Sequence, residues 1–206
     1  MPGEKKSRSK RVFVTALVVP ILTWILLSAV GLYATHKARK HAADCLADTL
    51  KIRPGVSTLE DVKLLVSRYN GSLRKMNPSS VSIDGSLWGN DSYWAGIGFD
   101  NRWLHRLIFA PKTVLGIDIC VRNDRVTLLS VAFAKTDNPF TGILIEEKPE
   151  GGDNPGFVST PSGMGKIIHL TAEIGEAKRA AAYSLNLDCL TRIRGCRSVK
   201  ELSNEP

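Results

Sequence analysis

The residues of this chain whose chemistry is easiest to connect with a function are its four cysteines and four histidines. Cys189 and Cys196 lie seven residues apart, and Gly195 supplies a flexible turn directly before the second thiol. A disulfide at the end of a helix can close a small loop of this kind, so we predict a Cys189–Cys196 bridge if the segment is exported. Cys45 and Cys120 have no local partner and could pair with each other or stay reduced. The alternative is four free thiols, because cysteine also behaves as a small buried hydrophobe.

The histidines form no recognisable catalytic or metal-binding pattern. His36 and His41 lie five residues apart, a spacing that does not align two ligands on one face of a helix. His105 and His169 have no serine or cysteine partner that the sequence identifies, although such sites assemble in space. A zinc site is disfavoured because the chain contains no C-x-x-C pair. We therefore expect no catalytic residue, no metal and no cofactor, and a protein that is not an enzyme.

An enrichment in aromatic residues is the other chemical feature. Trp88, Tyr93, Trp94 and Trp103 lie within one short stretch of the chain. One interpretation is that they pack in the core of a sheet and its hairpins. The other is that they form an interaction surface for a protein, a glycan or a membrane.

An uncharged run of 22 residues, Val12–Tyr33, precedes all of these residues. As a helix it would be about 33 Å long, enough to cross a hydrocarbon core of about 30 Å. A buried core helix of this size would carry a polar stripe, and this run has none. A cleaved signal peptide has a shorter apolar region and a small-x-small site, whereas a basic segment, Ala34–Lys40, follows here. We predict a retained transmembrane helix at residues 12–33.

The positive charge of the chain belongs to the flanks of this run. Between Met1 and Ala43 there are eight Lys or Arg residues and a single acidic residue, Glu4. This segment therefore supplies most of the net charge of +8. The remainder is nearly neutral, so the charge does not indicate nucleic-acid binding. Five Lys or Arg residues precede the run and three follow it closely. The positive-inside rule therefore favours, by two charges, an inner-membrane protein with a cytoplasmic N-terminus and an extracytoplasmic, periplasmic domain.

The elements that must position these residues divide the chain into four parts. They are a basic tail at residues 1–11, the transmembrane helix at 12–33, a juxtamembrane helix or linker at 34–54, and an extracytoplasmic domain at 55–206. Within the domain, Ser57-x-x-Glu60 is a capping box that predicts the start of an amphipathic helix, and Asn70-Gly71 predicts its end.

Strand patterns dominate the following hundred residues. Strands are expected at Ser92–Phe99, Val114–Val121, Arg125–Ala134, Ile143–Glu147 and Gly165–Thr171, with a hairpin turn at Asn123-Asp124, a further apolar run at Trp103–Phe109 and a loop at Pro149–Gly165. A helix is expected at Glu176–Ile193. Hairpin-connected strands without intervening helices favour an antiparallel sheet. We therefore predict an α+β domain in which N- and C-terminal helices flank an antiparallel sheet of about four or five strands.

Two local patterns resemble known proteins. The segment Gly55–Leu65 (GVSTLEDVKLL) resembles the G-x-[ST]-x-x-x-V-x-x-L-L helix start of small lipoproteins in the bacterial outer-membrane assembly machine. The pattern FDNRWL at Phe99–Leu104 with Ala110-Pro111, together with the ending Asn186–Cys196, is similar to uncharacterised bacterial single-pass membrane-anchored proteins. The second resemblance implies a bacterial source and a membrane anchor, and it implies no activity.

Taken together, these patterns favour a membrane-anchored envelope protein whose domain binds another envelope protein without catalysing a reaction. One alternative is a module that binds a small ligand or a lipid, with the aromatic residues and the 149–165 loop beside a pocket. Another is a hydrolase whose site is assembled in space from His105 or His169. Both alternatives depend on side-chain geometry that the sequence leaves open.

Overall fold

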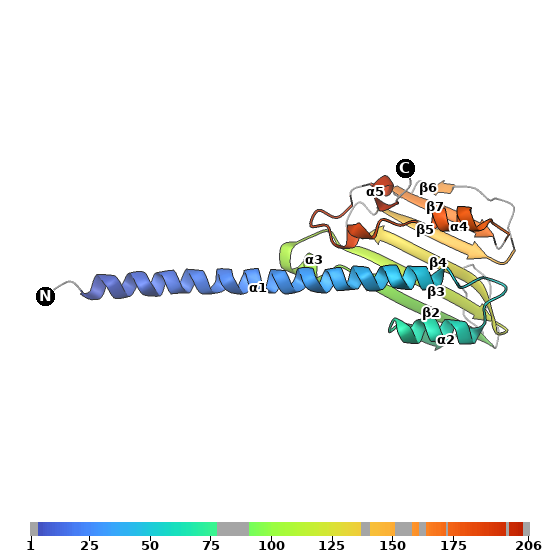
Figure 1. Cartoon of the computed structure of the whole chain (residues 1–206), viewed down its shortest axis with the longest axis horizontal. Helices are drawn as coiled ribbons and strands as arrows, with labels where there is room; N and C mark the ends of the chain where they lie inside the picture. Colours follow the sequence, from blue (N-terminus) through green and yellow to red (C-terminus); the bar gives the residue numbers. More distant parts are fainter. Residues whose placement is uncertain are drawn as a thin grey trace.

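Helix α1 (Glu4–Thr49) is 46 residues long and extends from the domain as a rod (Figure 1). It begins within the predicted basic tail, carries Pro20 in its interior, and continues past the apolar run as expected. Its segment Val18–Thr49 is long and apolar enough to cross a membrane. Only 11% of the most apolar 18-residue window of this segment is buried inside the structure, so this window is not a core helix.

The computed structural model describes residues 4–77, 91–136, 141–150, 158–160, 164–171, 173–196 and 198–203. In these residues seven strands form one sheet: β1 (Ser72–Lys75), β2 (Ser92–Asp100), β3 (Thr113–Arg122), β4 (Arg125–Lys135), β5 (Thr141–Lys148), β6 (Val158–Thr160) and β7 (Met164–Thr171). Their order is β1-β2-β3-β4-β5-β7-β6, and every pair is antiparallel except β5 with β7. The predicted α+β class is confirmed. The strand count exceeds four or five because the short edge strands β1 and β6 were not expected.

The core lies on the sheet face that α1, α2 and α4 cover (Figure 1). One cross-strand row shows why this face is buried. It consists of Ile97, Ile117, Val131, Ile145 and Ile168 on five neighbouring strands. Each of these side chains is at most 8% exposed. Because β-branched residues pack well on a pleated surface, this row both favours the strands and holds the helices against them.

Helix α2 (Leu59–Arg68) begins one residue later than its sequence suggests. The capping box joins Thr58 and Asp61, so the prediction of Ser57 and Glu60 is wrong. The reason is that Ser57 has another role: its hydroxyl accepts a hydrogen bond from the Arg53 amide, and this bond closes the turn after α1. The predicted helix end is confirmed, since Asn70 adopts a left-handed conformation directly after the C-cap.

The apolar run at Trp103–Phe109 lies in a short helix, α3 (Arg102–Ile108), rather than in a strand. Leu104, Leu107 and Ile108 have the spacing of one helical face, and they line a groove shared with α1. Contact with α1 therefore explains why a run of strand-like composition folds as a helix here.

The C-terminal helix is shorter than the predicted Glu176–Ile193. Helix α4 (Glu176–Ala182) ends before Tyr183, and a 3-10 helix, η1 (Leu187–Leu190), follows. Between them Leu185 forms a β-bridge with Ser203, just after α5 (Val199–Leu202). This bridge draws the chain out of helical geometry, which explains the early end of α4.

A buried ion pair joins α1, the sheet and α4. The Arg179 Nε donates to both carboxylate oxygens of Glu147, at 3.0 and 2.9 Å, and these side chains are 1% and 0% exposed. The guanidinium also donates to the carbonyl oxygens of Leu50 and Ile52, which directly follow α1. Tyr183 donates to Glu147 as well, and burial followed by the Glu147 charge raises the pKa of Tyr183 well above its usual value. The end of the long helix is thereby fixed to the domain.

Candidate functional site

The predicted aromatic surface is distributed over separate parts of the fold. Tyr93 and Trp94 are consecutive in β2, so their side chains point to opposite faces of the sheet. Tyr93 packs against the main core, and Trp94 packs against Cys120 and Leu128 on the other face. Trp103 is exposed on α3, and Trp88 lies outside the described residues.

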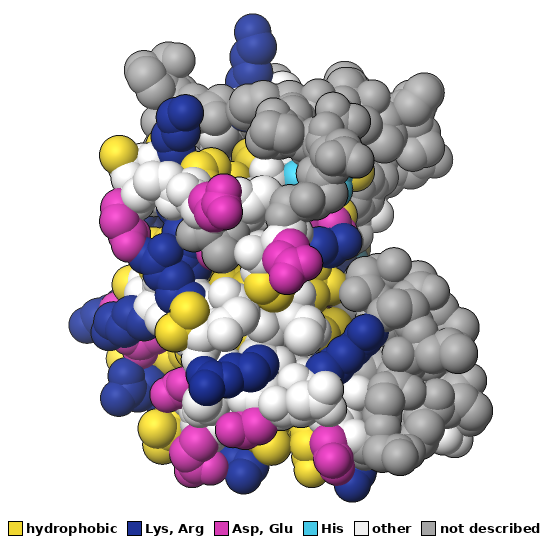
Figure 2. All heavy atoms as spheres, turned by 90° about the vertical axis from the view of Figure 1, so that its right-hand side faces the viewer, with side chains coloured by type: hydrophobic (Ala, Val, Ile, Leu, Met, Phe, Trp, Pro, Cys, Tyr) yellow, Lys and Arg dark blue, Asp and Glu magenta, His cyan; other side chains and the backbone are white. Residues whose placement is uncertain are grey.

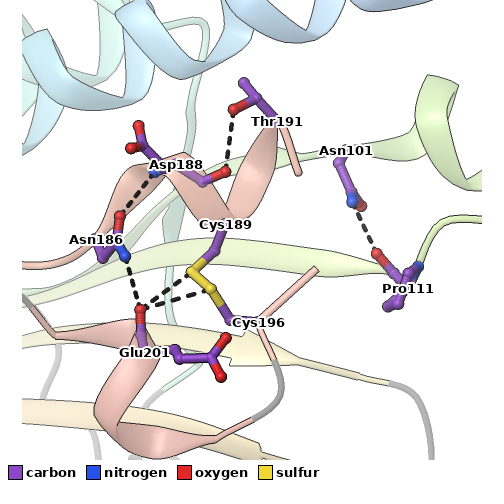
Figure 3. Close-up of a disulfide and its surroundings, with 8 residues drawn as sticks. All are labelled: Asn101, Pro111, Asn186, Asp188, Cys189, Thr191, Cys196 and Glu201. Carbon is purple, nitrogen blue, oxygen red and sulfur yellow. Dashed lines mark hydrogen bonds between the residues drawn. A yellow bond between two sulfur atoms is a disulfide. The ribbon is translucent and has the colours of Figure 1, made fainter. Parts of the chain in front are cut away.

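The predicted disulfide is present between Cys189 and Cys196, with the two Cα atoms 5.3 Å apart (Figure 3). Both sulfur atoms lie close to the carbonyl oxygen of Glu201, at 3.4 and 3.5 Å. Asn186 donates to the same carbonyl oxygen, so the bridge, η1 and α5 form one packed unit. Both cysteines are buried, which identifies the bridge as structural.

The two remaining cysteines form no disulfide and are buried. Cys45 belongs to the core beneath the helices, whereas Cys120 belongs to the small cluster on the other face of the sheet. A bond between them is therefore excluded by the sheet itself. Burial raises the pKa of Cys45 to about 11, which makes this thiol a poor nucleophile at neutral pH.

The face of the sheet opposite the helices has an unusual composition. Its central row runs through Gly98, Gly116, Ala132, Leu144 and Ile167 on five neighbouring strands. An antiparallel sheet with one solvated face usually carries polar side chains there, and glycine is depleted from strands. We call this surface, with the polar row described below, the glycine face.

The glycines of the central row are not required by the fold. Gly98 and Gly116 are cross-strand partners on β2 and β3. Within the described part of the chain, no atom lies within 4 Å of a Cβ built at either position, and neither residue has a positive φ. Internal packing and backbone conformation therefore leave both glycines unexplained. Glycine in a strand often marks a place where a ligand or another backbone approaches closely.

A polar row lies beside the glycine row on the same face, two residues along each strand. It consists of Asp118, Ser130, Glu146 and His169 on β3, β4, β5 and β7. His169 Nδ1 and Glu146 Oε2 are 3.3 Å apart. Neighbouring strands are about 4.8 Å apart, so the row runs for about 14 Å across the sheet. Asp118, Glu146 and His169 are partly exposed in this row, whereas Ser130 is buried.

Trp94 closes one end of this row. Gly96 permits this arrangement, because a Cβ at that position would lie 2.5 Å from the indole ring of Trp94. The ring therefore lies over the strand and is partly exposed. Burial raises the pKa of Asp118, and a hydrogen bond from Trp94 partly offsets the rise. The Trp94 ring, the Asp118 carboxylate and the two glycines without side chains are thus adjacent.

The raised pKa predicts that Asp118 costs the fold stability at neutral pH. A group whose pKa is raised on folding favours the folded state at low pH, and this contribution is lost as pH rises above the ordinary value of 3.8. We expect Asp118→Asn to leave the melting temperature at pH 7 unchanged or higher and to flatten its pH dependence. The measurement is thermal unfolding from pH 4 to 8, with exposed Asp44→Asn as the control. A lower melting temperature at pH 7 would show that Asp118 is a stabilising residue.

The geometry gives little support to a hydrolytic site. His169 lies beside Glu146, and the strand that carries Glu146 separates it from Ser130. His105 Nδ1 lies 2.8 Å from the carbonyl oxygen of Ala110 and so takes part in closing the end of α3. Within the described ranges, no group of three or more His, Cys, Asp or Glu residues is placed to hold a metal ion.

A hollow lies between the end of α1 and α2, with a volume of about 650 Å³. Its rim carries Asp48, which accepts hydrogen bonds from Lys51, Arg68 and Tyr69. These three donors, Lys51 first, hold the pKa of Asp48 well below its usual range. Burial, followed by the bond to Asp48, raises the pKa of Tyr69 to about 12. The polar groups at this rim therefore bind one another.

Sequence reasoning missed the glycine face because each strand was read separately. In the segment VLGIDICV every second residue points to the same side of the strand, and Gly116 and Asp118 could be assigned to one side from the sequence. Their alignment with Gly98, Ser130 and Glu146 depends on strand register, which sequence periodicity alone does not fix.

No protein-family model, curated protein or solved structure matches the chain. The fold and its surfaces are therefore the basis for assigning a function.

Proposed function

We propose that this chain is a single-pass membrane protein of the bacterial envelope and that its domain binds another protein without catalysing a reaction. Residues 12–33 would cross the inner membrane with the N-terminus in the cytoplasm, and the domain would lie on the extracytoplasmic side. The exposed apolar helix, the positive charge at its N-terminal flank and the disulfide support this arrangement.

The observation that carries the binding role is the open pair Gly98 and Gly116 in the middle of the sheet. Two facing residues without side chains, one on each strand, form a floor that the backbone of a partner can approach closely. The polar row and Trp94 lie beside this floor, where they supply hydrogen bonds and an aromatic anchor. A protein segment lying across the strands would contact all three parts.

A photoreactive amino acid placed at Gly98 tests this role in intact cells. Because no atom of the described residues lies within 4 Å of a Cβ there, the replacement is compatible with the described fold. We expect a discrete protein adduct from position 98 and none from Leu64, an accessible position on α2 that is 64% exposed. Equal adducts from both positions, or none from position 98, would contradict a partner on the glycine face.

Filling the floor should weaken the complex and leave the domain folded. We expect Gly116→Leu to reduce the adduct at position 98 by at least about fivefold, because extra methylenes in a packed interface cost about 1–3 kcal/mol. The melting temperature should not fall, since the new side chain meets open space. An undiminished adduct would place the partner elsewhere.

A further inference from the structure

Two segments that are far apart in sequence lie together at the end of the domain from which α1 extends (Figure 1). The first is α3 with the turn that follows it, and the second is the loop closed by the Cys189–Cys196 disulfide. They touch at Gly195, where a Cβ would lie 3.1 Å from Pro111. We call this surface the α3 edge and define it by Trp103, Arg106, Phe109, Arg192, Ile193 and Arg194.

The α3 edge lies directly against the apolar part of α1. Gly31 allows the contact, because a Cβ there would lie 2.6 Å from the Cδ1 atom of Leu107. An apolar groove of about 340 Å³ between them is lined by Trp24 and Leu32 of α1 and by Ile193 of the disulfide loop, among others. The α1 residues along the groove span about 12 Å of helix. The groove is therefore level with the C-terminal half of the apolar run, the half nearest the domain.

Three large apolar side chains of the edge point into solvent. Trp103 is 55% exposed, Ile193 is 57% exposed and Phe109 is 89% exposed. Phe109 also has a φ of 53°, in the left-handed conformation that glycine usually supplies at a helix C-terminus. A bulky residue in this conformation is strained. Neither its backbone conformation nor its packing against the described residues explains a phenylalanine here.

The same edge is positively charged. Arg106, Arg192 and Arg194 are exposed, and the described residues provide no acidic partner for any of them. By contrast, Arg102 is paired with Asp100 and Arg39 with Asp188. At the opposite end of the domain, Lys, Arg, Asp and Glu side chains are interspersed (Figure 2). Unpaired cations beside exposed apolar groups suit the boundary between acyl chains and anionic headgroups.

We propose that the α3 edge is seated in the headgroup layer of the membrane that α1 crosses and that it binds anionic phospholipid. This inference rests on the proposed membrane anchor. Phe109, Trp103 and Ile193 enter the acyl boundary, while Arg106, Arg192 and Arg194 contact phosphates. Together with α1, this second attachment fixes the orientation of the domain, so that the glycine face is held at a defined angle to the bilayer.

The test uses the full chain in nanodiscs made with about 30% phosphatidylglycerol in phosphatidylcholine, an anionic fraction chosen to resemble a charged leaflet. An environment-sensitive fluorophore is attached at Phe109→Cys or Ile193→Cys, and quenching by lipids brominated near the headgroup is measured. For a label at position 26, which lies nearer the middle of the bilayer, the lipids are brominated midway along the acyl chains. A label at Leu26→Cys reports insertion of α1. A label at Val56→Cys is the matched control for a solvated apolar position, because the Val56 side chain is 66% exposed. The native free thiols are buried and do not compete for the label.

We expect at least about twofold quenching at positions 26, 109 and 193 and none at position 56. Replacing phosphatidylglycerol with phosphatidylcholine should reduce quenching at position 109, as should Arg192→Gln with Arg194→Gln. Quenching at position 26 without quenching at 109 and 193 would overturn the seating of the edge while leaving the anchor intact. Absence of quenching at all four positions would overturn the anchor. Equal quenching at position 109 in both lipid mixtures would contradict the binding of anionic lipid.

Discussion

Replacing Arg179 with methionine is expected to lower the free energy of unfolding of the domain by about 3–5 kcal/mol. The substitution leaves the carboxylate of Glu147 buried without its cation, since Glu147 is 0% exposed. It also removes the donors to the carbonyl oxygens of Leu50 and Ile52. Because these carbonyls follow directly after α1, the loss should also loosen the joint between the long helix and the sheet. Chemical denaturation of the full chain in nanodiscs provides the measurement.

Two variants make this result specific to the buried ion pair. Lys178→Met removes an exposed cation from the same helix and should change stability by less than about 0.5 kcal/mol. Adding Glu147→Leu to Arg179→Met should recover part of the loss, because an apolar pair avoids burying a lone charge. If Arg179→Met and Lys178→Met behave alike, the ion pair does not hold α1 to the domain.

Removal of the disulfide should have the next largest effect. The bridge closes a loop of about eight residues, for which chain entropy gives a stabilisation of about 2–3 kcal/mol. We expect the double variant Cys189→Ala with Cys196→Ala to lose about this amount and to become insensitive to reductant. The wild-type melting temperature should fall when reductant is added.

The buried free cysteines supply the control for this prediction. Cys120→Ala removes a thiol that the structure shows to be unbridged, so its melting temperature should keep the same response to reductant as the wild type. A wild-type protein whose stability is unaffected by reductant would show that the bridge contributes nothing to the folded state.

Patterns within single elements were sufficient to predict much of the fold. The apolar run Val12–Tyr33 indicated a long helix, and Asn123-Asp124 indicated the hairpin in which both residues have positive φ. The spacing of Cys189 and Cys196 predicted their bridge. Each of these signals depends on neighbouring residues only, which is why a linear reading finds them.

Features that depend on contacts between distant segments were not predicted. Helix α3 forms where Leu104 and Leu107 meet α1, and α4 ends where Leu185 pairs with Ser203. The buried partner of Glu147 comes from a helix 32 residues later. For α3 and for the end of α4, a tertiary contact determined the local structure against the local sequence preference. The Glu147–Arg179 pair depends on strand register and on how α4 packs on the sheet.

The candidate site was the least predictable part. The aromatic residues were visible in the sequence, yet the sheet separates Tyr93 from Trp94 onto different faces. Gly98 and Gly116 form an open floor only because the strand register places them opposite each other. The sequence shows two glycines, but it does not show that they are neighbours. A sequence pattern has no means of distinguishing a glycine that the fold requires from one that leaves space for a partner.

Both proposals require that α1 crosses the membrane and that the domain lies on the side opposite the N-terminus, and thiol labelling in spheroplasts tests this requirement most directly. Two variants are needed. Ser7→Cys lies before the apolar run, and Leu64→Cys lies on α2 at a position that is 64% exposed. A membrane-impermeant maleimide is added to each variant. Cys45 and Cys120 are buried and give a low background. We predict that the Leu64→Cys variant reacts in intact spheroplasts and that the Ser7→Cys variant reacts only after the membrane is opened with detergent. Labelling of the Ser7→Cys variant alone in intact spheroplasts would reverse the orientation and contradict both proposals.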